Sequence, residues 1–213
     1  MKLNLGSHNK TIGEDWINVD GLELPNVDLI CDFNIVPFKY KENRSIGLEN
    51  NLPINYIKFN DNSIDEIQMV EVLEHISFRN TEKVLKELYR IIKPNCKIHI
   101  QVPDCGKMME YYVNKQICEC VPHKSIQGNT EGDFKADKNC WNCKGKGMIN
   151  PLRWLYSFTG AQKHKFDQHL MIFTKENLKE ILQKVGFKKI EFKEHIYKLK
   201  VNCYKKLNEN KII

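Results

Sequence analysis

Two carboxylates and an imidazole lie within five consecutive residues, Glu71-Val72-Leu73-Glu74-His75. If this segment turns helically, Glu71 and Glu74 are three residues apart and share a face with the neighbouring ring of His75. Carboxylate oxygens and an imidazole nitrogen are ligands that suit Mg²⁺ or Mn²⁺, and also Zn²⁺. Without a metal, an imidazole beside a carboxylate can take a proton as a general base. The segment therefore predicts either a metal site at Glu71, Glu74 and His75 or an acid–base group.

A second chemical pattern is formed by cysteines, of which the chain has eight. Cys118-x-Cys120 and Cys140-x-x-Cys143 are separated by a polar stretch that contains glycines. Paired thiolates at such spacings can close a tetrahedral zinc site, and a long loop is costly to order without such a cross-link. Four reduced thiols are the first alternative, and a disulfide is the second. The pattern predicts a structural zinc site.

Short apolar runs recur along the chain and end in glycine or acidic residues, which predicts the strands of a sheet. We expect this sheet to position the groups described above. The clearest helix is Thr81–Ile92, with Asn80 as its N-cap, and Thr174 and Gly186 bound a later helix over residues 175–185. Only residues 6–15 join the first two strands, so any helix there must be very short or absent. Residues 33–60 read as a long loop, and residues 105–165 break the strand–helix rhythm. The predicted strands cover residues 2–5, 16–19, 27–31, 64–70, 97–102, 187–192 and 197–203.

This order of elements predicts an α/β fold: a Rossmann-like, mostly parallel sheet with an antiparallel C-terminal edge hairpin. At 213 residues the chain fits one domain, residues 1–213, with the cysteine-containing residues 105–165 as an insertion or a substrate-side region within it.

The ends of the strands carry motifs in a characteristic order: Leu3-Asn4-Leu5-Gly6-Ser7, Trp16-Ile17-Asn18-Val19-Asp20, Asp61-Asn62-Ser63-Ile64-Asp65, Val72-Leu73-Glu74-His75-Ile76, Leu88-Tyr89-Arg90-Ile91-Ile92-Lys93-Pro94 and Val102-Pro103-Asp104. In this order they resemble the class I methyltransferases of the broad type 11 group. The resemblance covers residues 2–104 and resumes with the helix and Gly-Phe turn of residues 173–187.

The resemblance implies S-adenosylmethionine as the cofactor and a set of residues that bind it: Gly6, Ser7, Asp20, Asp32, Val70 and Glu71. Gly6 would permit close approach of the backbone, Asp20 would accept the ribose hydroxyls, and Asp32 would meet the adenine edge. Loop capping is the alternative role of the two aspartates. His8 stands where the group often has a further glycine.

The Glu-x-x-Glu-His string is also similar to that of two O-methyltransferase groups, one acting on catechol-like rings and one on the ribose 2′-hydroxyl of small RNAs. In the RNA group a downstream histidine completes the site, and His169 precedes residues 173–176 at that spacing. Glu74, His75 and His169 are therefore the predicted catalytic residues, with either histidine as a general base where no metal is bound.

Composition separates the functional alternatives only weakly. The net charge of +6 favours acidic partners slightly, but the lysines are scattered and form no concentrated block. No run of 18 apolar residues and no signal-peptide core is present, so we expect a cytoplasmic protein without a membrane partner. The first hypothesis is methyl transfer to oxygen or nitrogen of a small molecule or saccharide. The alternatives are an RNA ribose 2′-O-methyltransferase with a Glu/Glu/His metal site, and a non-catalytic, zinc-stabilised binding module.

Overall fold

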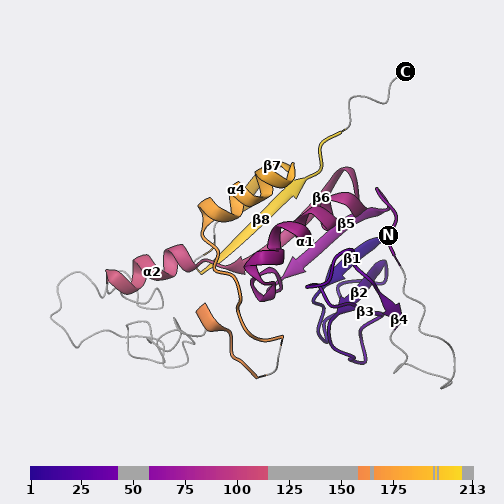
Figure 1. Ribbon diagram of the computed structural model, residues 1–213, viewed down its shortest axis with the longest axis horizontal. Helices are drawn as coiled ribbons and strands as arrows, with labels where there is room; N and C mark the ends of the chain where they lie inside the picture. The colour runs from indigo at the N-terminus through magenta and orange to yellow at the C-terminus, as the bar shows by residue number, and fades with distance from the viewer. Residues whose placement is uncertain (43–57, 115–157, 164–165, 194, 196, 208–213) are drawn as a thin grey trace. The chain divides into compact units, whose positions relative to one another are not determined.

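The computed structural model describes residues 1–42, 58–114, 158–163, 166–193, 195 and 197–207 (Figure 1). The chain divides into two compact units. The first consists of Met1–Asp104 and Leu170–Ile213, and the second of Cys105–His169.

The first unit is built on an eight-stranded sheet with the strand order β4-β3-β2-β1-β5-β6-β8-β7. Strands β1, β2, β3, β5 and β6 are parallel to their neighbours in this group, whereas β4, β7 and β8 pair antiparallel. This confirms the α/β class and the antiparallel hairpin at the C-terminal edge. The strands are β1 (Lys2–Leu5), β2 (Trp16–Asp20), β3 (Leu29–Ile30), β4 (Lys41–Glu42), β5 (Ile64–Val70), β6 (Ile92–Pro103), β7 (Lys188–Lys193) and β8 (Lys198–Tyr204).

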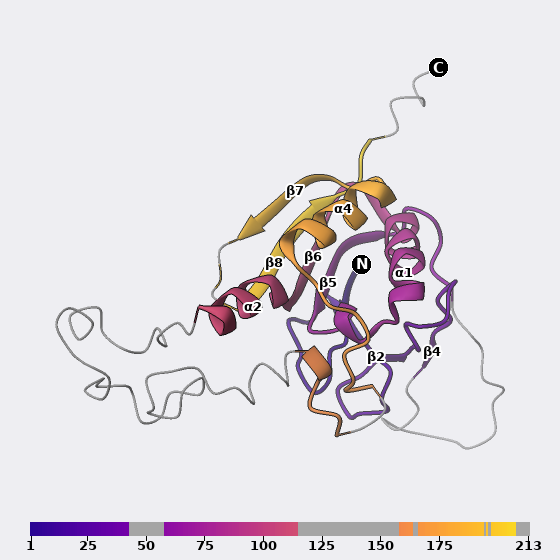
Figure 2. The ribbon, with the colours of Figure 1, turned by 60° about the vertical axis from the view of Figure 1, so that its left-hand side comes forward.

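Two α-helices of the first unit, α1 (Phe78–Ile91) and α4 (Lys175–Val185), pack side by side (Figures 1 and 2). Helix α4 begins and ends as predicted, because Thr174 forms a capping box with Asn177 and Gly186 adopts a left-handed conformation. The predicted start of the earlier helix was wrong. Helix α1 begins one turn sooner, after Ser77, because the Asn80 side chain donates to the Asn34 carbonyl instead of capping the helix.

Three short elements also differ from the prediction. The third strand is confined to β3, although Asp28 and Cys31 on either side of it still donate backbone hydrogen bonds to β2. The two-residue strand β4 lies in the predicted loop, where no alternating pattern could reveal it. In the second unit, helix α2 (Cys105–Val113) occupies the start of the region predicted to be irregular.

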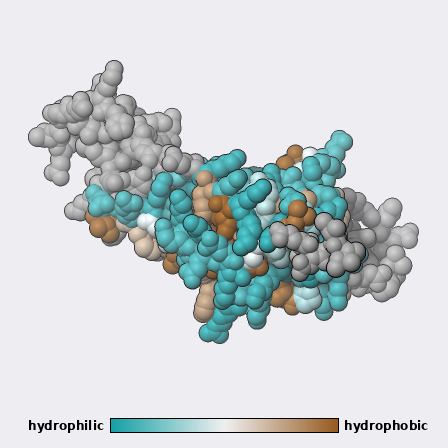
Figure 3. Space-filling view, turned by 90° about the horizontal axis from the view of Figure 1, so that it is seen from above, coloured by the Kyte–Doolittle hydropathy of each residue, from teal (hydrophilic) through white to brown (hydrophobic). Residues whose placement is uncertain are grey.

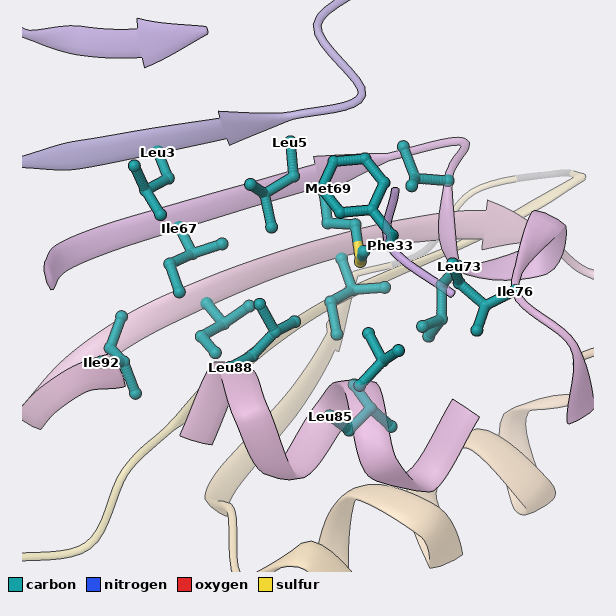
Figure 4. Packing of buried hydrophobic residues seen from close by; sticks show 14 of the residues in the cluster. Leu3, Leu5, Phe33, Ile67, Met69, Leu73, Ile76, Leu85, Leu88 and Ile92 are labelled. Carbon is teal, nitrogen blue, oxygen red and sulfur yellow. The ribbon is translucent and has the colours of Figure 1, made fainter. Parts of the chain in front are cut away.

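The core follows from the alternation of side chains along the strands. Leu3 and Leu5 of β1 lie opposite Ile67 and Met69 of β5, and all four are fully buried. In Figure 4 they lie on the side of the sheet that faces Leu85 and Leu88 of α1. Helix α1 therefore covers the apolar face.

On the opposite side of the sheet, alternate residues of β5, β6 and β8 form a polar face. Gln68 of β5 lies beside His99 of β6, which lies beside Asn202 of β8, and the His99 Nδ1 is 2.9 Å from the Asn202 Oδ1. As predicted, residues 6–15 form no helix between β1 and β2. A doubly wound sheet normally carries helices on both faces, whereas the described helices of the first unit cover its apolar side. The described surface in Figure 3 is mostly hydrophilic, with small separate apolar patches.

Within the described part of the chain, no helix is long and apolar enough to cross a membrane.

Candidate active site

The strand order places the candidate site at the carboxyl ends of the central parallel strands, which we call the carboxyl edge of the sheet. Strand β1 has β2 on one side and β5 on the other, so the chain reverses its direction of growth across the sheet at β1. Open α/β sheets bind ligands outside the carboxyl ends of the strands at such a switch point. Gly6, Asp20 and Glu71 occupy the ends of β1, β2 and β5 at this edge.

The turn after β1 requires glycine at its first position. Gly6 has a φ of +69°, and a Cβ atom added to it would lie 2.0 Å from the Val72 Cγ2 atom. The amides of Gly6 and Ser7 both donate to the Val19 carbonyl, at 2.7 and 3.2 Å, which binds the turn to β2. His8 also has a positive φ, +48°, so the residue in the place of a second glycine adopts a conformation that glycine favours.

Asp20 fixes this turn from the end of β2. Its Oδ2 accepts the His8 backbone N–H at 2.8 Å, and its Oδ1 accepts the Leu22 N–H at 2.9 Å. Asp32, which is exposed, accepts the Asn34 N–H at 2.9 Å. Both aspartates therefore cap loops. The Asp20 oxygens each retain a lone pair, so the glycine turn and this carboxylate fit a cofactor with a ribose and a close backbone contact.

Glu71 is held by the two strands beyond β5. Its φ is +56°, and its backbone N–H donates to the Gln101 carbonyl at 2.8 Å. Its Oε1 accepts the Gln101 Nε2–H at 3.1 Å and lies 3.2 Å from the Lys198 Nζ. Lys198 reaches this edge because β8 is antiparallel, so its first residue lies beside the last residue of β6.

Glu74 and His75 lie on the 3₁₀ helix η2 (Leu73–His75), which follows β5 directly. The Glu74 side chain is 1% exposed, and neither carboxylate oxygen has a hydrogen-bond partner among the described residues. Burial, together with the nearby charge of Glu71, raises the pKa of the Glu74 carboxyl well above its usual range. A Glu74 oxygen and a His75 ring nitrogen lie within 4.8 Å of each other.

This pair can act in two chemical ways. A buried carboxyl without a partner is costly unless it is protonated or binds a ligand. Glu74 and His75 therefore fit either proton transfer to and from an acceptor or binding of a divalent cation.

The segment that precedes α4 is hydrogen-bonded to the backbone of Glu74. The amides of Leu170 and Met171 donate to the Glu74 carbonyl at 2.8 and 3.1 Å. His169, the last residue of the second unit, donates its own amide to the Thr159 carbonyl at 3.1 Å. The cysteine pairs 118/120 and 140/143 lie outside the described residues.

Two polar residues of this edge, Gln101 and Lys198, were not predicted from the sequence. Gln101 is one of several alternating polar residues in a strand, and Lys198 is one of many scattered lysines. The predicted antiparallel hairpin was the available signal, because it brings the start of the last strand to the carboxyl ends of the parallel strands.

Solved structures with a similar fold are distant in sequence. A methyltransferase from Methanosarcina mazei is 15% identical, with 97% of this chain and 92% of that chain covered and a TM-score of 0.45. One from Aquifex aeolicus is 14% identical, with coverages of 95% and 80% and a TM-score of 0.43. The 1,6-didemethyltoxoflavin-N1-methyltransferase of Burkholderia thailandensis is 11% identical, with coverages of 97% and 71% and a TM-score of 0.46. No curated protein matches the chain.

The sequence as a whole does match one family. Residues 17–191 match the family model described as a methyltransferase domain, which spans most of the chain from β2 to β7. The chain therefore belongs to this methyltransferase family and is a class I S-adenosylmethionine-dependent enzyme.

Proposed function

We propose that this enzyme transfers a methyl group to an oxygen or nitrogen atom of a small molecule or saccharide, at the edge formed by Gly6, Asp20, Glu74 and His75. The observation that carries the proposal is the Glu74 carboxyl, which is buried and without a partner among the described residues, directly after β5. Family membership supports the catalytic alternatives over a non-catalytic binding module.

Six residues are proposed to hold the cofactor: Gly6, Ser7, Asp20, Asp32, Val70 and Glu71. Support for the first three comes from the tight turn after β1 and its bond to the Asp20 carboxylate. S-adenosylmethionine supplies a methyl group on a positively charged sulfur, so the protein must mainly orient the acceptor.

Glu74 and His75 are proposed to serve the acceptor. As the acceptor atom bonds to the methyl carbon and the carbon–sulfur bond breaks, an O–H or N–H proton must leave. The His75 ring can take this proton as a general base. The Glu74 carboxyl can donate or accept a hydrogen bond to orient the same group, according to its protonation state.

Exposed apolar side chains near η2 support an acceptor with an apolar part. Ile35 follows Asn34, whose Oδ1 accepts the Ser77 N–H at 3.2 Å, and the exposed Phe78 follows Ser77. Leu170 is exposed and bonded through its amide to the Glu74 carbonyl. Apolar side chains on the segments that flank Glu74 favour a small organic molecule over a polyanion, because a polyanion is held mainly by cations.

Metal-assisted methyl transfer, with a ribose 2′-hydroxyl of RNA as one acceptor, is the second candidate. Glu74 and His75 supply an oxygen and a nitrogen ligand. The sequence spacing alone supports His169 as a further ligand. A divalent cation bound there would lower the pKa of an acceptor hydroxyl.

A structural zinc at Cys118, Cys120, Cys140 and Cys143 remains a proposal based on their spacing. Metal content of the purified protein tests it. About one zinc per chain, lost in Cys140→Ser but retained in Cys31→Ser, supports the site, whereas zinc-free folded protein contradicts it. Cys31 is a suitable control because it is buried in the core of the first unit.

The test of the proposed function is methyl transfer from labelled cofactor to parallel sets of phenols, amines, saccharides and small RNAs. Labelling of a small molecule, lost in His75→Gln but retained in His99→Gln, supports the proposal. His99 is the matched control because it lies on the polar face of β6. Labelling of RNA alone, with a requirement for added Mn²⁺ or Mg²⁺, would support the second candidate instead.

A further inference from the structure

Glu71 and Glu74 are three residues apart, but their carboxylates have opposite surroundings. The Oε1 of Glu71 receives the Gln101 amide at 3.1 Å and the Lys198 ammonium at 3.2 Å. Both oxygens of Glu74 are buried and lack a partner among the described residues. The two carboxylates are therefore not equivalent as ligands, although the sequence pattern treats them alike.

The backbone contributes to this difference. Glu71 has a left-handed φ of +56°, and its N–H is bonded to the Gln101 carbonyl. The same residue of β6 thus holds both the main chain and the side chain of Glu71. Lys198 adds a positive charge from β8, and the two side chains of this ion pair are similarly half-exposed, at 37% and 35%.

Glu71 lies outside the group of possible metal ligands to which Glu74 and His75 belong. A divalent cation beside Glu74 and His75 would be repelled by the Lys198 ammonium, and the ion pair with Lys198 offsets the negative charge by which Glu71 would otherwise attract the cation.

We infer that the Lys198 ammonium competes with a divalent cation for the Glu71 carboxylate. The ion pair keeps Glu71 from acting as a metal ligand and keeps the metal affinity of the Glu74/His75 group low. This inference rests on the proposed site at Glu74 and His75. It assigns Lys198 as a positioning residue that acts through Glu71, and it gives Gln101 a supporting role.

The test is Mn²⁺ binding to the full-length protein, measured by calorimetry and by the electron paramagnetic resonance signal of free Mn²⁺. Lys198→Met should bind Mn²⁺ at least about tenfold more tightly than the wild type, which corresponds to about 1.4 kcal/mol. Lys198→Arg should remain near the wild-type affinity because it keeps the charge. Lys200→Met is the matched control: Lys200 lies two residues along β8, also half-buried, and should change the affinity less than about twofold.

The role of Glu71 is tested by the double variant Lys198→Met/Glu71→Gln, which should lose the gain in affinity. An unchanged or weaker affinity in Lys198→Met would overturn the inference, and so would a gain that persists in the double variant. Thermal melts of each preparation show that it is folded. Binding of S-adenosylhomocysteine in the same preparations separates a failure of this inference from a failure of the proposed function. A protein that has no cofactor site would not bind S-adenosylhomocysteine, whatever its affinity for Mn²⁺.

Discussion

The Asp20 carboxylate accepts the His8 backbone N–H at 2.8 Å and so joins the end of β2 to the turn after β1. His8, which donates this bond, has a left-handed φ of +48°. The connection between the two strands contains no helix, so this hydrogen bond and the two amide bonds to Val19 hold the turn in its place. The turn after β1 is thus held by backbone hydrogen bonds together with the Asp20 carboxylate.

Gly6→Ala should destabilise the protein strongly. Alanine is disfavoured at a φ of +69°, and its Cβ would overlap the Val72 Cγ2 at 2.0 Å. Together the backbone and packing effects should lower the free energy of unfolding by about 2–4 kcal/mol, measured by urea titration.

A double variant separates the two causes. Val72→Ala removes the overlapping methyl group, so Gly6→Ala should cost less in the Val72→Ala background than in the wild type. Gly13→Ala is the control, because its nearest neighbour lies at 3.4 Å, and it should stay within about 0.5 kcal/mol. An equal cost in both backgrounds would mean that the Val72 contact does not matter.

Glu74→Gln should stabilise the metal-free protein at neutral and alkaline pH. The pKa of this carboxyl is raised in the folded state above its usual 4.5, so the folded protein binds the proton more tightly than the unfolded chain. Stability must then fall as the pH rises from about 4.5 through the folded pKa. Glutamine has no such titration, so its advantage should grow over this range in urea titrations with EDTA present.

Glu82 supplies a control with the opposite sign. Hydrogen bonds from Lys184 and Lys86 lower the pKa of Glu82 to about 2. Its contribution is therefore present above about pH 4.5 and is lost as the pH falls toward 2. Glu82→Gln should differ from the wild type at neutral pH and converge with it in acid. The same pH trend in both variants would contradict the assignment of Glu74 as the buried acid.

Lys205→Met should destabilise the end of α1. The Lys205 Nζ donates to the carbonyls of Tyr89, Arg90 and Ile92 and to the Asn62 Oδ1, at 2.6–3.2 Å. Methionine keeps much of the packing but removes these hydrogen bonds from a charged donor, at a cost of about 2–3 kcal/mol in thermal or urea unfolding. Exposed Lys188→Met should cost less than about 0.5 kcal/mol. Equal effects of the two variants would show that Lys205 does not cap the helix.

Much of the fold could be predicted because local signals agreed with the final packing. Thr174 and Gly186 bound α4 as their types indicate, and the closing hairpin forms where alternation predicts it. The start of α1 could not be predicted, because Asn80 is drawn away by a contact with Asn34, 46 residues earlier. Tertiary contacts of this kind leave no periodic signal in the sequence.

The candidate site was predicted less completely. The sequence predicts Glu74 and His75 as site residues, because a short string of ligating residues follows a strand, and this stays a prediction. It suggested that Glu71 would share their role, but the ion pair of Glu71 depends on Lys198, more than a hundred residues later. Only the register of β6 with β8 brings these charges together.

We propose that the methyl donor binds at the carboxyl ends of β1 and β2. Calorimetric titration with S-adenosylhomocysteine, on wild type, Asp20→Ala and Asp15→Ala, tests it most directly. Asp15 is the matched carboxylate, because it precedes β2 at the opposite edge and pairs with Lys2. We expect the wild type and Asp15→Ala to bind and Asp20→Ala to lose at least about tenfold in affinity. Folded wild-type protein that does not bind, or equal affinity in Asp20→Ala, would contradict it.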